Sequence, residues 1–181
     1  MQSRERSLSW SMFIKLSLLA WLAMIGFDFL LHAGLLARLY LEPSPFLLPP
    51  QRAFALIPVG YLSFLILAFL LVWLMTQLRI SGWRPGGMFG LHFGALAWGA
   101  LILGLLSIST APIVLLLGWF VGQTIEFAIG GMVVGSALAS VPYRRLLLLV
   151  LVGVAGAFVI TIILQFLGIA PAAKISEQPG T

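Results

Sequence analysis

Five long apolar segments with few charged residues constrain the fold of this chain more than any other feature. A membrane-spanning helix needs about 20 predominantly apolar residues, and every segment reaches that length. None shows the alternation of apolar and polar residues that is typical of half-buried strands, so helices are expected. The five predicted spans cover residues 16–36, 54–78, 88–108, 113–138 and 146–167.

The composition also favours lipid over water as the main solvent. Of the 181 residues, 61% are apolar and 8% are charged, whereas a soluble domain carries about 25% charged residues. Too few charged side chains are available to cover a surface in water. The sequence therefore predicts an all-α integral membrane bundle, with one transmembrane domain over residues 1–170 and the lipid bilayer as its partner. Residues 171–181 are small and polar, and we expect them to form a disordered tail.

A proline-rich segment over residues 40–53 joins the first two predicted spans. Proline disrupts a helix interior and favours extended backbone in the residue before it. The residues around Phe46 are apolar as well. We expect a stiff linker, with a cover over the mouth of the bundle as the alternative.

Five spans place the two termini on opposite sides of the membrane, and the basic residues divide unevenly between these sides. The side of the N-terminus would hold seven of them: Arg4, Arg6, Lys15, Arg79, Arg84, Arg144 and Arg145. The other side would hold three: Arg38, Arg52 and Lys174. Because Lys and Arg concentrate on the cytoplasmic side, we predict a cytoplasmic N-terminus in a bacterial cytoplasmic membrane. The basic residues form no stripe, so nucleic-acid binding is not expected.

Glycines recur at four-residue spacing in two of the predicted helices. The third span carries Gly86, Gly90 and Gly94, and the fourth carries Gly118, Gly122 and Gly130, with Glu126 in the missing place. Residues four apart share one face of a helix, and small residues let membrane helices approach closely. We therefore predict that these two glycine faces pack against other helices and that Glu126 lies on one of them.

Four ionisable residues lie inside the predicted spans: Asp28, His32, His92 and Glu126. An ionised group at the centre of a membrane helix costs about 2.5–3.5 kcal/mol on insertion, so such groups face protein or a water-filled cavity. Asp28 and His32 are four residues apart and share one helix face. Glu126 lies at a similar depth, with Gln123 one turn before it. The sequence predicts a buried polar cluster of Asp28, His32, Gln123 and Glu126 that opens outward, with His92 outside it.

Three roles for this cluster stay open. It could be a hydrogen-bonded knot that fixes helix packing. It could handle protons or cations, because two carboxylates in a dry bundle cannot comfortably both be ionised and a neighbouring histidine could pass a proton outward. It could bind zinc or iron through Asp28, His32 and Glu126, with an open coordination position for catalysis.

Other catalytic chemistry has no signature in this sequence. The chain has no cysteine, which excludes disulfides, thiolate metal sites, thioether-linked haem and cysteine nucleophiles. A P-loop, a G-x-S-x-G motif and a dinucleotide fingerprint are also absent. We therefore do not expect an enzyme, and no cofactor is expected.

The run FDFLLHAGLLARLY, from Phe27 to Tyr40, resembles the first helix of small bacterial polytopic membrane proteins grouped as domains of unknown function. Those helices have an Asp in their outer part, then an aromatic residue or a His, then a Tyr before the first loop. The resemblance assigns Asp28, His32 and Tyr40 to this pattern. The stretch from Gly87 to Gly99 looks like their Gly-rich third helix. The resemblance implies a membrane architecture and no particular activity.

Together these features predict a multi-pass membrane protein that handles protons or a small polar solute through the buried cluster. The main alternative is a non-catalytic subunit or assembly factor of a larger membrane complex. A metal-dependent membrane enzyme is the second alternative. We also consider a homo-oligomer or a larger membrane complex, because five helices enclose little volume.

Overall fold

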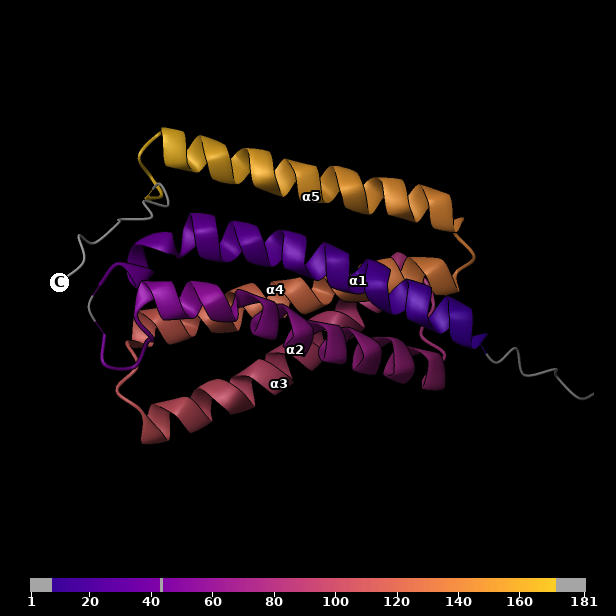
Figure 1. Ribbon diagram of the computed structural model, residues 1–181. Helices are drawn as coiled ribbons and strands as arrows, with labels where there is room; N and C mark the ends of the chain where they lie inside the picture. Colours follow the sequence, from indigo (N-terminus) through magenta and orange to yellow (C-terminus); the bar gives the residue numbers. More distant parts are fainter. Residues whose placement is uncertain (1–7, 43, 172–181) are drawn as a thin grey trace, which may run out of the picture.

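The computed structural model describes residues 8–42 and 44–171, and no strand occurs among them. The main helices are α1 (Trp10–Leu30), α2 (Pro50–Gln77), α3 (Trp83–Ile108), α4 (Ile113–Leu138) and α5 (Tyr143–Phe166). Two short helices follow α1, the π-helix η1 (Leu31–Leu35) and the 3₁₀-helix η2 (Ala37–Tyr40). The predicted all-α bundle of five long helices is confirmed (Figure 1).

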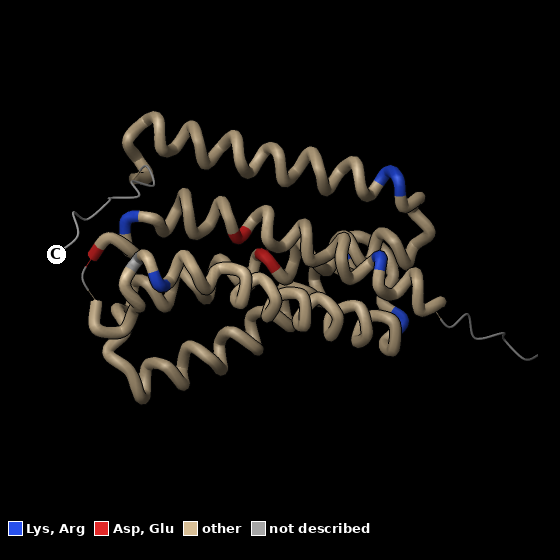
Figure 2. Tube along the Cα trace, in the orientation of Figure 1, with Lys and Arg blue, Asp and Glu red and all other residues tan. Residues whose placement is uncertain are grey.

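All five helices, counting α1 together with η1, are long and apolar enough to cross a membrane. Large apolar side chains such as Leu62, Leu103 and Ile162 are exposed on their outer faces, as contact with lipid requires. Lys and Arg positions gather near the two ends of the bundle (Figure 2). These features support a multi-pass membrane protein. The predicted tail, except for Pro171, lies outside the described residues.

Four of the five long helices begin before the predicted spans, and α4 begins at the predicted Ile113. At α1 and α2, the residues around the first turn explain the earlier start. α1 begins at Trp10 rather than near residue 16, after Ser9, whose hydroxyl accepts a hydrogen bond from the Met12 amide at 3.3 Å. A serine at this position satisfies a free amide of the first turn. α2 begins at Pro50 rather than residue 54, and proline at the first helical position has the backbone angle that a helix needs.

α3 and α4 form the most extensive helix pair of the bundle. Gly86 of α3 faces Gly131 and Gly135 of α4, and Gly90 faces the backbone of Phe127. The amide of Gly82, just before α3, donates to the Gly135 carbonyl at 2.8 Å. The glycine face predicted on the third span therefore packs against α4, with backbone touching backbone.

The glycine face predicted on the fourth span packs in a different direction. A side chain added at Gly118 or Gly122 would meet Leu36 or Leu31, at the end of α1 and just beyond it. At Gly130 it would meet Met24 of α1 and Leu71 of α2. α4 therefore has two glycine faces, one for α3 and one for α1 and α2, and it lies at the centre of the bundle.

The buried apolar core occupies one half of the bundle, toward the start of α1. Leu16 and Met24 of α1, Leu71 of α2, and Phe127 and Val134 of α4 are buried there. The other half, toward η1 and η2, contains the buried polar residues Asp28, Gln123 and Glu126. The bundle thus has an apolar half and a half with a polar interior.

The close contact between α3 and α4 can be tested with alanine at Gly90. A Cβ there would overlap the carbonyl oxygen of Phe127, whereas a Cβ at Gly104 of the same helix meets nothing within 4 Å. We expect Gly90→Ala to lower the free energy of unfolding by about 1–3 kcal/mol, because the backbone must move apart. Gly104→Ala should leave it unchanged or raise it by up to about 1 kcal/mol. Equal stabilities of the two variants in detergent unfolding would contradict this packing.

Candidate functional site

Polar side chains from α1, η1 and α4 meet inside the bundle. The Gln123 amide nitrogen donates to Asp28 Oδ1 at 3.3 Å, and His32 Nε2 lies 3.1 Å from the same oxygen. Asp28 and Gln123 are buried, whereas the His32 side chain is 32% exposed. Three of the four residues predicted for the polar cluster are therefore joined by direct contacts.

Glu126 is the most unusual member of the polar cluster. It has no exposed surface, and neither carboxylate oxygen has a hydrogen-bond partner among the described residues. Gln123 lies one turn before it on α4, but the Gln123 amide nitrogen donates to Asp28. A buried polar group without a partner costs several kcal/mol, and a charged one costs more.

A chain of contacts leads from Asp28 toward the loop end of the bundle. His32 Nδ1 is hydrogen-bonded to the Tyr40 hydroxyl, and the Trp119 indole nitrogen donates to the same hydroxyl at 2.7 Å. Because an indole N–H can only donate, the Tyr40 oxygen accepts from Trp119 and its own hydrogen is free to donate to His32. A neutral His32 with its hydrogen on Nε2 then donates to Asp28, so one tautomer satisfies every contact.

The irregular end of α1 brings His32 and Tyr40 together. In a continuous α-helix, residues eight apart are separated by about 12 Å along the axis. Here the π-turn, in which the Leu36 amide bonds to the Leu31 carbonyl at 2.8 Å, is followed by the 3₁₀-helix. The rings of His32 and Tyr40 consequently lie with their centres 5.6 Å apart. Helical π-turns occur frequently at functional sites.

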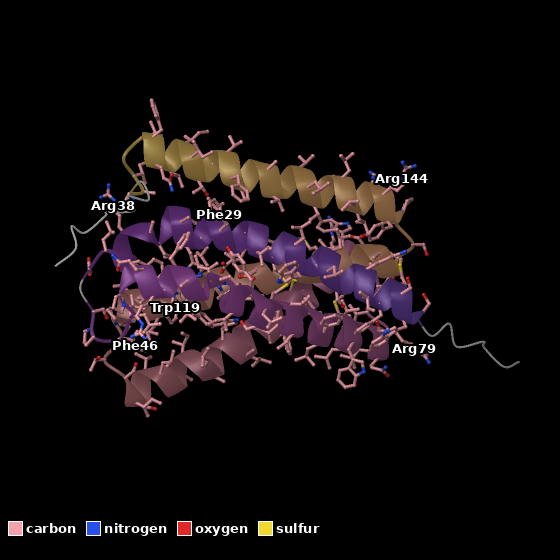
Figure 3. The ribbon with its side chains drawn as sticks, viewed as in Figure 1. Phe29, Arg38, Phe46, Arg79, Trp119 and Arg144 are labelled. Atoms are coloured by element: carbon pink, nitrogen blue, oxygen red, sulfur yellow. The ribbon has the colours of Figure 1, made fainter. Side chains whose placement is uncertain are left out.

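α5 and the turn that follows it hold this irregular segment in place, and the proline-rich loop packs beside Trp119. The Gln165 amide nitrogen donates to the Ala33 carbonyl of η1 at 3.3 Å, and Arg38 Nε donates to the Ile169 carbonyl at 2.6 Å. The ring of Phe46, from the loop, lies 6.0 Å from that of Trp119. Figure 3 shows Phe46, Trp119 and Arg38 at one end of the bundle and Arg79 and Arg144 at the other.

The described residues include no group of three or more His, Cys, Asp and Glu side chains that could hold a metal ion. The metal site predicted from Asp28, His32 and Glu126 gains no support from this arrangement and stays a prediction. One imidazole nitrogen of His32 contacts Asp28, the other contacts Tyr40, and Glu126 has no hydrogen-bond partner. His92 is exposed on α3 and lies outside the polar cluster.

Sequence reasoning missed Trp119, although a signal for it was present. Trp119, Gln123 and Glu126 follow the spacing i, i+4, i+7, which places all three on one face of α4. Trp119 contacts Tyr40, and Gln123 contacts Asp28. A polar stripe therefore runs along this face, beside the glycines that let α1 approach.

No protein-family model, no curated protein and no solved structure matches this chain. The resemblance of residues 27–40 to bacterial domains of unknown function therefore stays a prediction. The class that the fold supports is a multi-pass membrane protein with a polar cluster buried between two of its helices.

Tyr40 supplies a test of the outer part of this chain of contacts. Burial raises the pKa of Tyr40 above its ordinary value near 10, the hydrogen bond from Trp119 lowers it, and the negative charge of Asp28 raises it. The increase of the pKa through burial exceeds the decrease through the hydrogen bond from Trp119. We therefore expect Tyr40 to stay neutral up to about pH 10. Ultraviolet titrations of the wild type and of Tyr40→Phe should then show the same amount of phenolate up to that pH. An excess of phenolate in the wild type below it would contradict the burial of Tyr40.

Proposed function

We propose that this protein handles protons, or a small polar solute together with a proton, through the polar cluster. The observation that carries the proposal is the fully buried carboxyl group of Glu126, which has no hydrogen-bond partner among the described residues. A carboxylate in such a place is unfavourable unless a proton or a bound cation compensates its charge. A residue whose only role was packing would be expected to have its hydrogen bonds satisfied.

The contacts around Glu126 supply groups that can pass a proton on. Gln123, one turn before Glu126 on α4, donates to Asp28, and Asp28 contacts His32. An imidazole can take up a proton on one nitrogen and release it from the other, and the second nitrogen of His32 meets the Tyr40 hydroxyl. The partial exposure of His32 gives this path an opening to the outside.

The path opens toward one end of the bundle only. Beyond Glu126, toward the start of α1, the interior is filled by apolar side chains such as Met24, Leu71 and Phe127. In this conformation a proton or solute can therefore exchange with the end where Tyr40 lies and is blocked from the other. Transport across the membrane would need a second conformation in which the apolar half opens.

The basic residues support the orientation that we propose. Figure 3 shows Arg79 and Arg144 at one end of the bundle and Arg38 at the other. By their places near helix starts, Lys15, Arg84 and Arg145 belong to the first end and Arg52 to the second. By the excess of positive charge on the cytoplasmic side, the N-terminus is cytoplasmic and the polar cluster opens to the outside. The corresponding membrane is the cytoplasmic membrane of a bacterium.

Proton handling can be measured in vesicles that contain the purified protein and a pH-sensitive dye. After an imposed pH gradient, the wild type should dissipate the gradient faster than protein-free vesicles do. Glu126→Gln and Asp28→Asn should fall to the protein-free rate, because each removes an ionisable group from the path. Glu42→Gln is the matched control, since Glu42 is exposed in the loop, and should keep the wild-type rate. Wild-type rates in Glu126→Gln would reject the proposal.

Unfolding of the same variants in detergent separates this role from a packing role. Glu126 makes no hydrogen bond that glutamine would lose, so Glu126→Gln should not lower the free energy of unfolding. Asp28→Asn weakens the contacts with His32 and Gln123 and should lower it by about 1–3 kcal/mol. A large loss of stability in Glu126→Gln would instead favour the polar cluster as a packing device in a non-catalytic subunit.

A further inference from the structure

A groove lies between α1, α4 and α5, and no residue of the polar cluster lines it. Its volume is about 400 Å³, and Ala23, Phe27, Met132, Val133, Gly153 and Ala157 are among the residues that line it. It exists because α5 packs along α1 but touches α4 only sparsely, on the outside of the bundle (Figure 1). A side chain added at Gly153 or Gly156 would meet nothing within 4 Å.

The walls of the groove are suited to hydrocarbon. Ser136 is the one hydroxyl-bearing residue among the lining residues, and its hydroxyl donates to the Met132 carbonyl at 2.7 Å. Ordered water requires two to four polar partners, which these walls do not offer. Because the helices around the groove are long enough to span a membrane, the medium that reaches it is the bilayer.

The dimensions of the groove decide between a lipid chain and another helix. Along α5 the lining runs from Leu146 to Ile160, which is about 21 Å at 1.5 Å per residue. A volume of about 400 Å³ over that length gives a mean cross-section of about 19 Å² for the positions that the centre of a water-sized sphere can take. The open width is about 7 Å once the diameter of that sphere is added. A helix with side chains is about 10 Å across, which is too wide. One extended hydrocarbon chain fits, because carbon atoms in contact lie about 4 Å apart.

Two arginines stand at one end of the groove. Arg144 and Arg145 directly precede the lining residue Leu146 in the first turn of α5, and both are exposed. Arg145 is four residues before the lining residue Leu149, so it lies on nearly the same helix face. Neither guanidinium has a hydrogen-bond or ion-pair partner in the described part of the chain. Guanidinium groups bind phosphate through paired hydrogen bonds. Figure 3 shows Arg144 at this end of α5.

We infer that the groove binds one acyl chain of an anionic phospholipid, whose phosphate lies at Arg144 and Arg145. The apolar walls and the narrow section select a single hydrocarbon chain. The arginines at the end select a negatively charged headgroup over a zwitterionic one.

The open space at Gly153 and Gly156 makes a direct test available. The double substitution Gly153→Leu with Gly156→Leu should fill the groove, because a Cβ at either position meets nothing within 4 Å. Gly60→Leu with Gly104→Leu is the matched control, because both sites are equally open and neither lines the groove. The full chain in detergent is titrated with phosphatidylglycerol and, separately, with phosphatidylcholine, and bound lipid is counted by native mass spectrometry.

We expect the wild type and the control to bind one phosphatidylglycerol per chain. The groove-filling variant should bind it at least about tenfold more weakly, the effect of losing roughly two buried methylene groups. Arg144→Gln with Arg145→Gln should remove the preference for phosphatidylglycerol over phosphatidylcholine and keep acyl-chain binding.

Two results would overturn the inference. One is equal binding of phosphatidylglycerol by the groove-filling variant and the control. The other is a wild-type dimer that the groove-filling substitutions dissociate with no change in bound lipid, which would assign the groove to a second copy of the chain. Both readouts are independent of proton flux, so failure here leaves the proposed function of the polar cluster intact.

Discussion

The close approach of α4 to its neighbours is the contact on which the rest of this structure depends. Helices in lipid gain little from burying apolar surface, so they associate through tight packing and hydrogen bonds between helices. On α4 one row of glycines meets the backbone of α3, and another row meets leucines of the α1 segment. Only at this short range can Gln123 reach across to Asp28.

The two faces of the α1 segment divide the interior into two chemically different regions. Asp28 and Leu31 face α4, where the polar cluster and Gly122 lie. Phe27 and Leu30 face the groove beside α5. α5 also touches the irregular end of this segment through Gln165 and Ala33. A movement of α5 would therefore displace η1, the segment that places His32 beside Tyr40.

The apolar half of the bundle sets the limits of what the polar cluster can do in this conformation. Leu16, Met24 and Phe127 have no exposed surface, and they separate Glu126 from the end where α1 begins. In the role that we propose, a buried acid that is open to one side only could take up a proton and return it to that side. Moving the proton onward requires the packing in that half to loosen.

Part of the site was predictable because helix periodicity and membrane depth are local properties. The four-residue spacing of Asp28 and His32 predicted that these two share a helix face. The similar depth of Asp28 and Glu126, with Gln123 one turn before Glu126, predicted that Gln123 lies near them. The four-residue spacing of Trp119 and Gln123 likewise places both on one face of α4, but it was not used to predict a contact of Trp119. Tyr40 was linked to Asp28 and His32 only through the resemblance of residues 27–40, because regular helix geometry separates Tyr40 from His32 by about 12 Å.

From the sequence alone, hydropathy and charge determined that the chain forms five membrane-spanning helices, because lipid admits only backbones that satisfy their own hydrogen bonds. The tertiary structure alone decided which side chains meet. The π-turn and the 3₁₀-helix after α1 bring His32 to Tyr40. The same contacts occupy both nitrogens of His32, while Glu126 is left without a hydrogen-bond partner among the described residues. Such choices depend on distances between helices, which no pattern along one helix encodes.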